Sequence, residues 1–234
     1  RDEYLRSLEQ KQALVDLDPE NTEFQAALAT AFNKVAVIEQ QQGDLANALD
    51  HHRQELAVRL ELAGRDEADM PARRDLSLAH TFLGELLLAM GEQQEALEHQ
   101  LAAWELQQQL VRWDPANVSW RRGLATSARL AGLGLAGIGR EGEGIAAIDE
   151  SREILRQLLE VDASSVDYRQ ELILSNQARA TALVTGDPAA AELAAREALE
   201  GIAALRAEEE LTARMQGVEA RAYIDHGRAL AALA

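Results

Sequence analysis

The stretch that decides the fold runs from Leu83 to Leu97 and reads LGELLLAMGEQQEAL. Its first half is apolar at helical spacing, and Gly91 then interrupts the pattern. Glycine adopts the left-handed backbone conformation at little cost, which makes it a common helix terminator. A second helical pattern resumes at once with Ala96. The stretch therefore predicts two helices joined by a tight turn at Gly91.

This pattern recurs every 48 residues. Gly43, Gly91 and Gly139 are 48 apart, and Gly186 falls one residue early. Four other columns keep the same phase, and they begin at Asp18, Leu28, Leu49 and Val58. No segment alternates with a period of two, so no strands are predicted. A repeat of this length is one supersecondary unit that stacks on its neighbours. The sequence predicts an all-α array of about ten helices in antiparallel pairs, with turns near the four glycines.

The repeat also defines the expected domain organisation. We expect a single repeat domain over 1–234, with units at 18–65, 66–113, 114–161 and 162–207. Each unit holds a first helix, A, and a second helix, B. Residues 1–17 align with a helix B that lacks its helix A, and residues 208–234 form one more helix A. Because the chain starts at Arg1 on half a unit, we expect a fragment of a larger protein with a covalently linked upstream domain.

Composition excludes several classes of protein. The 234 residues carry 40 acids and 23 bases, a net charge of -17, which argues against a nucleic-acid partner. The absence of cysteine excludes disulfides and thiolate metal sites. No apolar run approaches the roughly 18 residues that a membrane span needs. The abundance of alanine and arginine over lysine suggests a bacterial source. We expect a cytoplasmic protein, with the periplasmic portion of a membrane-anchored protein as the alternative.

No catalytic or metal-binding arrangement is visible. The glycines of Gly132 to Gly137 match a dinucleotide-binding pattern, but they lie inside a predicted helix rather than after a strand. His51 and His99 share a repeat position without a convincing third ligand, and His80 is expected to pack in the core. We therefore predict no enzyme activity, no metal and no cofactor.

One basic column keeps the phase of the repeat. Arg73, Arg121 and Arg169 are 48 apart and fall in the first turns of A helices, where a cation opposes the helix dipole. They are either held by nearby acids such as Asp75 and Asp167, or they form a ridge that receives an acidic or phosphorylated segment. We expect the architectural role, because the column repeats with the core, and retain the ridge as a secondary candidate site.

The hairpin resembles a known family. Leu83-Gly84 followed by Gly91 to Leu97 resembles the core of a tetratricopeptide repeat, as does the segment from Gly43 to Leu49, and Asp114-Pro115-Ala116-Asn117 resembles that family's repeat boundary. The family's usual repeat has 34 residues. The additional residues here would lengthen each helix by about two turns, or roughly 10 Å. The resemblance implies a right-handed α-solenoid whose A helices line a concave, partner-binding surface.

The family's groove positions can be transferred to this sequence, counting back from the turn of each unit. This resemblance implies a partner-binding set of twelve residues: Asn33, Val37, Gln40, Gln41, Thr81, Glu85, Leu88, Arg129, Leu133, Asn176, Ala180 and Leu183. Their mixture of amides, small groups and aliphatics suits recognition of a peptide backbone and apolar side chains.

Two functions follow as hypotheses. The first is a non-catalytic scaffold that binds a partner protein or peptide along the concave face. The alternative is a sensor or regulatory domain of a bacterial signalling protein, for example C-terminal to a serine/threonine kinase, that binds a peptide or small ligand. An open groove would favour the first, and an enclosed pocket at the glycine-rich third unit the second. The first hundred residues carry 20 acids and 9 bases, so a charged partner is expected to be basic.

Overall fold

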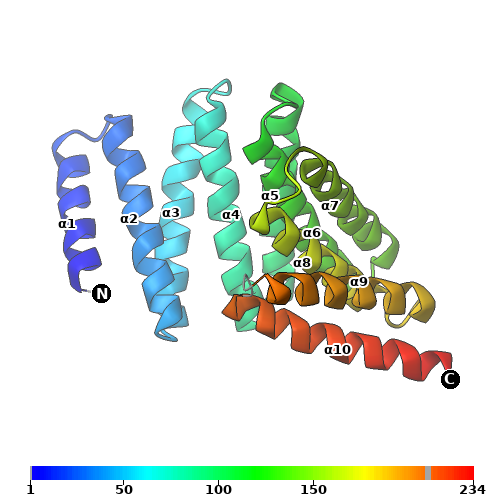
Figure 1. The fold of residues 1–234 in the computed structure, drawn as a ribbon. Helices are drawn as coiled ribbons and strands as arrows, with labels where there is room; N and C mark the ends of the chain where they lie inside the picture. Colours follow the sequence, from blue (N-terminus) through cyan, green and yellow to red (C-terminus); the bar gives the residue numbers. More distant parts are fainter. Residues whose placement is uncertain (1, 209–211) are drawn as a thin grey trace. The chain divides into compact units, whose positions relative to one another are not determined.

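A computed structural model describes residues 2–208 and 212–234 of the chain. Within these ranges the chain forms ten α-helices and no strand (Figure 1). The helices are α1 (Asp2–Leu17), α2 (Thr22–Gln41), α3 (Leu45–Arg65), α4 (Met70–Met90), α5 (Gln93–Trp113), α6 (Val118–Gly137), α7 (Glu141–Val161), α8 (Val166–Leu183), α9 (Pro188–Ala207) and α10 (Ala213–Leu233). The all-α prediction is confirmed, while the right-handed sense of the array stays a prediction.

The predicted turns lie at the predicted glycines. Gly43, Gly91 and Gly139 have φ of 80°, 89° and 85°, the left-handed region that other residues adopt only with strain. At Gly91 the closing bonds are those of a helix C-terminus, with the amide of Glu92 donating to the Leu87 carbonyl at 2.9 Å. Gly186 lies in the fourth turn, between α8 and α9.

Helix starts follow the Asp-Pro-x-Asn signature. In both copies the asparagine is the N-cap: the Asn21 side chain accepts from the Phe24 amide, and the Asn117 side chain from the Trp120 amide, each at 3.1 Å. These bonds satisfy backbone donors that have no partner within the helix. The aspartate of each signature therefore marks the end of the preceding segment, and the asparagine opens helix A.

The chain divides into two compact units, Arg1–Trp113 and Asp114–Ala234. This division falls at the predicted boundary between the second and third repeats. In the first unit α1 to α5 pack in chain order, each against the next (Figure 1). Its main apolar cluster contains Leu56, Leu76 and Leu83, which are buried between α3, α4 and α5. A single repeat domain over 1–234 stays a prediction.

The second unit contains a close approach of two helices. A Cβ added at Gly132 would lie 2.6 Å from the Gly144 carbonyl oxygen, and one added at Gly144 would lie 2.5 Å from the Gly132 carbonyl oxygen. Glycine is therefore required on both α6 and α7. In the first unit the equivalent pair is Gly84 and Ala96, where an added Cβ on Gly84 would meet the Ala96 carbonyl oxygen at 3.2 Å. The third repeat thus brings its two helices closer than the second does.

The last helix is shorter than the expected 208–234. α9 continues to Ala207, and α10 begins at Ala213 with Thr212 at its N-cap. Residues 209–211 of the expected helix lie outside the described residues. α10 packs against α9 and α8 within the second unit.

Candidate functional site

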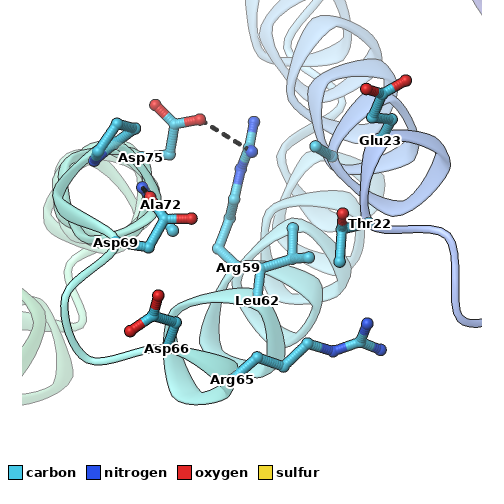
Figure 2. Close-up of a pocket in the computed structure, with 11 residues that line it drawn as sticks. Thr22, Glu23, Arg59, Leu62, Arg65, Asp66, Asp69, Ala72 and Asp75 are labelled. Carbon is cyan, nitrogen blue, oxygen red and sulfur yellow. Dashed lines mark hydrogen bonds and ion pairs between the residues drawn. The ribbon is translucent and has the colours of Figure 1, made fainter.

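The candidate site is centred on a cavity in the first unit, between α2, α3 and α4 (Figure 2). Its volume is about 360 Å³. Each of the three helices contributes to the lining, and so does the turn from Asp66 to Asp69 that joins α3 to α4. Helices α2 and α4 are consecutive A helices, so the cavity opens between the two helices that were expected to form a binding face.

A partly buried ion pair lines this cavity. Arg59 of α3 is 8% exposed, and its Nη1 lies 2.9 Å from Oδ2 of Asp75 on α4, the dashed contact in Figure 2. Its Nη2 donates to the Thr30 hydroxyl on α2 at 3.0 Å. Asp75 is also 3.0 Å from the guanidinium of Arg74. Arg59 thus ties all three helices together, and removing Asp75 would leave a buried charge without its counter-ion.

Three exposed carboxylates also line the cavity, and we refer to Glu23, Asp66 and Asp69 as the acidic rim. Asp66 Oδ1 accepts from the Ala68 amide at 2.8 Å, and Asp69 Oδ1 caps α4 by accepting from the Ala72 amide at 2.9 Å. These local bonds hold both aspartates in place. In Figure 2 the two aspartates lie on one side of Arg59 and Glu23 lies on the opposite side.

A second cavity of about 230 Å³ shares Arg59 and Asp75 with the first. It is also lined by Asn33, whose amide donates to Glu55 Oε2 at 2.9 Å. We refer to the two cavities together as the α2–α4 groove. The carboxylate of Glu55 lies 3.2 Å from His52 Nδ1, and both side chains are buried. The walls of the groove are therefore held by two polar networks, one around Arg59 and one around Glu55.

In the first unit, the predicted partner-binding residues lie mostly at accessible positions. Asn33 lines the α2–α4 groove, and it also lines a further cavity of about 230 Å³ with Val37, beside Tyr4 of α1. Gln40 and Thr81 are half-buried, whereas Gln41, Glu85 and Leu88 are exposed. The structure brings Asn33 and Val37 into one cavity and does not gather the other members around it.

In the second unit, most of the predicted residues are buried. Arg129 is 5% exposed and lies 3.5 Å from Glu171 Oε2, while Leu133 packs against a core cluster on α7 and α8. Asn176 is buried and accepts from Arg152 Nε at 2.7 Å. Ala180 and Leu183 lie inside two small core clusters. As a partner-binding set, the twelve residues stay a prediction.

The arginine column contacts helix B of its own repeat. Arg73 donates to the side-chain oxygen of Gln109, and Arg121 donates to that of Gln157 at 2.7 Å. Arg169 pairs instead with Glu208 at 2.6 Å. The expected carboxylates have other partners: Asp75 pairs with Arg59 and Arg74, and Asp167 with Arg122. These contacts support the architectural role, with a glutamine as the acceptor in two of the three repeats.

The contacts of the histidine side chains do not follow their repeat positions. His80 Nδ1 lies 3.0 Å from His99 Nδ1, and the ring centroids are 5.2 Å apart. Burial, together with the neighbouring His99, lowers the pKa of His80 to about 4. His51 bonds Glu39 at 2.7 Å instead of approaching His99. Among the described residues, no group of three or more potential metal ligands is brought together.

The sequence reasoning did not identify Arg59 as a site residue. The signal that could have found it is a departure from the repeat. Arg59 corresponds to Gln107 in the second repeat and to Leu155 in the third, and Asp75 corresponds to Gly123. A charge that replaces the neutral residues of neighbouring repeats at a buried position indicates a contact specific to that junction, although the same two positions are charged again at Lys11 and Glu171.

No family model and no curated protein matches the sequence. Among solved structures, BtubC (BKLC) from P. vanneervenii is 18% identical, with a TM-score of 0.66 over 98% of this chain and 85% of that one. Weaker matches include the C-terminal part of a TPR repeat-containing protein from Cytophaga hutchinsonii (13% identity, TM-score 0.33, 98% of this chain and 90% of that one). The TPR2AB domain of yeast Sti1 in a pHSP90 complex also matches (12% identity, TM-score 0.29, 94% and 92%). The helical hairpins, their glycine turns and the match to BtubC together identify a tetratricopeptide-like helical-repeat fold.

Proposed function

We propose that this chain is a non-catalytic scaffold that binds an extended segment of a partner protein in the α2–α4 groove. The observation that supports this is the pair of cavities that share Arg59 and Asp75 between two consecutive A helices. An extended segment fits this shape because its main-chain groups could bond the polar walls while alternate side chains enter the two cavities. The fold by itself would not assign this function.

The polar network favours binding over catalysis. Four polar side chains of the groove are already engaged in pairs: Arg59 with Asp75, and Asn33 with Glu55. A preorganised surface of this kind loses little conformational entropy when a partner binds. We propose the scaffold rather than the sensor because the two cavities lie next to each other between consecutive A helices, where an extended segment can occupy both.

The test is to select peptides against the whole chain from a displayed random library and then to block the groove. Thr30 is an exposed residue of α2 that lines the second cavity, so Thr30→Tyr would occupy that cavity. Ala57→Tyr is the matched control, because Ala57 is exposed on α3 and lines none of the three cavities described here. We expect Thr30→Tyr to weaken the selected peptides at least tenfold and Ala57→Tyr to leave them unchanged.

Two results would contradict the proposal. One is a library selection that yields no peptide binding in the micromolar range. The other is selected peptides that bind Thr30→Tyr as tightly as the unchanged chain, which would place their site elsewhere. Circular dichroism of both variants would show whether either substitution disturbs the helices.

A further inference from the structure

We propose that His80 of α4 and His99 of α5 form a binding site for one divalent transition-metal ion of the class of Zn²⁺. The inference is independent of the scaffold proposal. It follows from the way in which the two imidazoles meet: His80 Nδ1 lies 3.0 Å from His99 Nδ1, and the ring centroids are 5.2 Å apart. The neutral imidazole nitrogen is a ligand that suits zinc, copper and nickel alike.

The distance between the two nitrogens is one that a shared ion requires. Zinc binds imidazole nitrogen at about 2.0–2.1 Å, so ligand angles of about 90–110° separate two such nitrogens by about 2.9–3.4 Å. The observed 3.0 Å lies within this interval. Without an ion, one ring donates its Nδ1–H to the other ring. Rotation of each ring about its Cβ–Cγ bond, a soft torsion, would direct both lone pairs to one point beside the line that joins them.

The hairpin itself holds the two positions together. Gly84 lies one turn after His80, and a Cβ added there would lie 3.5 Å from the Cβ of His99. The two helices therefore cross closely beside the histidines. In the first repeat the equivalent residues are Phe32 and His51, and their rings are also neighbours, with centroids 6.0 Å apart. Because the repeat brings these positions together before any ion binds, the entropic cost of ordering the ligands is small.

Both rings are available as neutral ligands. Burial, together with the neighbouring His99, lowers the pKa of His80 to about 4, and burial also lowers the pKa of His99. A metal ion must compete with protons for imidazole nitrogen, and this competition is weak near neutral pH at such low pKa values. Both side chains are half-buried, so an ion from solvent can reach them.

The charges around the pair favour a cation. Glu95 and Glu98 of α5 act to raise the pKa of His99 through their negative charge, and Arg53 of α3 opposes them. Arg53 is itself paired with Glu95 at 2.9 Å. Two acids thus face one base. No group of three protein ligands is formed among the described residues, so water would complete the coordination of the ion.

The other histidines of the first unit are engaged differently. His51 Nδ1 lies 2.7 Å from the Glu39 carboxylate, and His52 Nδ1 lies 3.2 Å from that of Glu55. An Nδ1 that donates to a carboxylate has no lone pair for a metal. The sequence did not indicate the site, because the 48-residue spacing groups His99 with His51 rather than with a residue of α4.

The experiment titrates Zn²⁺ into the chelator-treated, 15N-labelled full chain and follows the heat of binding and the imidazole 15N signals. Because two protein ligands replace the four of a structural zinc site, we expect one site with a dissociation constant on the order of 10 µM. The Nδ1 signals of His80 and His99 should shift together. Mg²⁺ prefers oxygen ligands and should leave them unchanged. Zinc that leaves either Nδ1 signal unshifted would overturn the inference.

His80→Asn and His99→Asn each remove one ligand and keep a polar side chain. We expect each to weaken zinc binding at least tenfold. His226→Asn is the matched control, because His226 is a half-buried histidine on α10 that lies 3.8 Å from Glu192, and we expect it to change the affinity less than twofold. Equal affinity in all three variants would assign the zinc to surface carboxylates and contradict the site. If a variant fails to fold by circular dichroism, the 15N signals of the unchanged chain decide.

A bridging ion should also stabilise the hairpin. Zinc at about 100 times its dissociation constant should raise the thermal unfolding midpoint, because the paired imidazoles exist only in the folded chain. We expect this rise to disappear in His80→Asn and to persist in His226→Asn. A midpoint that rises equally in both variants would show that the ion does not bridge α4 and α5 through His80, and the inference would be wrong.

Discussion

At the scale of single residues, the arginine column shows how a repeat position is stabilised. Arg73 and Arg121 each reach a glutamine on helix B, 36 residues further along the chain. In the first repeat the same two positions hold Gln25 and Glu61, whose side chains lie 3.4 Å apart. The column therefore pairs the two helices of a hairpin even where its residue types change. The cost of a cation near a helix N-terminus is offset by a hydrogen bond to a charged donor.

Replacing Arg121 with alanine should lower the free energy of unfolding by about 1 kcal/mol, because the bond to Gln157 is lost. Arg156→Ala is the control, an exposed arginine on α7 for which we expect a change within about 0.5 kcal/mol. Urea unfolding of both variants, with Gln157→Ala and the double variant, measures the coupling directly. If the urea midpoint of Arg121→Ala is unchanged, the arginine column is not architectural and becomes a candidate binding surface.

His80 should make stability depend on pH. Its pKa is lowered from 6.5 to about 4 in the folded chain, so between these values the unfolded chain binds the additional proton. Stability contributed by this group is therefore complete above pH 6.5 and is lost as the pH falls toward 4. The side chain is half-buried, so we expect a loss on the order of 1 kcal/mol between pH 7.5 and pH 5.

The measurement compares urea unfolding of the chain and of His80→Phe at both pH values. Carboxylates that titrate in the same range contribute to both proteins, so the difference isolates the imidazole. We expect the variant to lose about 1 kcal/mol less than the unchanged chain. If both proteins lose the same amount, His80 does not titrate at this lowered pKa.

At the scale of helices, the contact between α6 and α7 depends on having no side chain at Gly132. A methyl group there would lie 2.6 Å from a backbone oxygen and 2.7 Å from Ile148 Cγ1. We expect Gly132→Ala to cost about 2–3 kcal/mol, because the two helices must separate. Gly137→Ala, on the same helix with no neighbour within 4 Å, should instead gain up to about 1 kcal/mol. Thermal unfolding of both variants checks the pair, and a neutral Gly132→Ala would show that α6 and α7 can move apart freely.

The elements themselves were predictable because their signals are local. A glycine at positive φ marks each of the first three hairpin turns, and an Asn cap begins α2 and α6. The groove was not predictable in the same way. Arg59 and Asp75 belong to different repeats and meet only after α3 and α4 pack, and the neutral Gln107 and Gly123 replace them at the next junction.

The fourth repeat shows a second limit. Its groove residues were counted back from the early Gly186, which selected Asn176, Ala180 and Leu183, and all three are buried. The residues one position later, in phase with the 48-residue repeat, are Gln177, Thr181 and Val184, and these are half-buried. One residue turns a helix by about 100°. The fourth repeat is therefore one residue short in the turn after α8. The residues of α8 itself keep the 48-residue spacing from their equivalents in the earlier repeats.

At the scale of the whole molecule, charge decides which partners can approach. The net charge of -17 repels nucleic-acid phosphates, so we expect no complex with duplex DNA or RNA in a gel-shift titration at physiological salt. A micromolar complex would contradict this. A basic partner segment should associate more slowly as salt is added. No helix of the described residues is long and apolar enough to cross a membrane.

The two kinds of arginine contact have different consequences for duplication of the gene. Arg121 and Gln157 lie in one 48-residue block. A copied block would carry both residues, so the protein would lengthen and each arginine would keep its hydrogen-bond partner. Arg59 and Asp75 lie on opposite sides of a block boundary. A copy of the first or second repeat inserted between residues 65 and 66 would recreate this junction, whereas a copy of the third repeat would place Gly123 opposite Arg59 and erase the groove. Growth of such an array at this junction therefore keeps or silences the recognition site according to which repeat is copied.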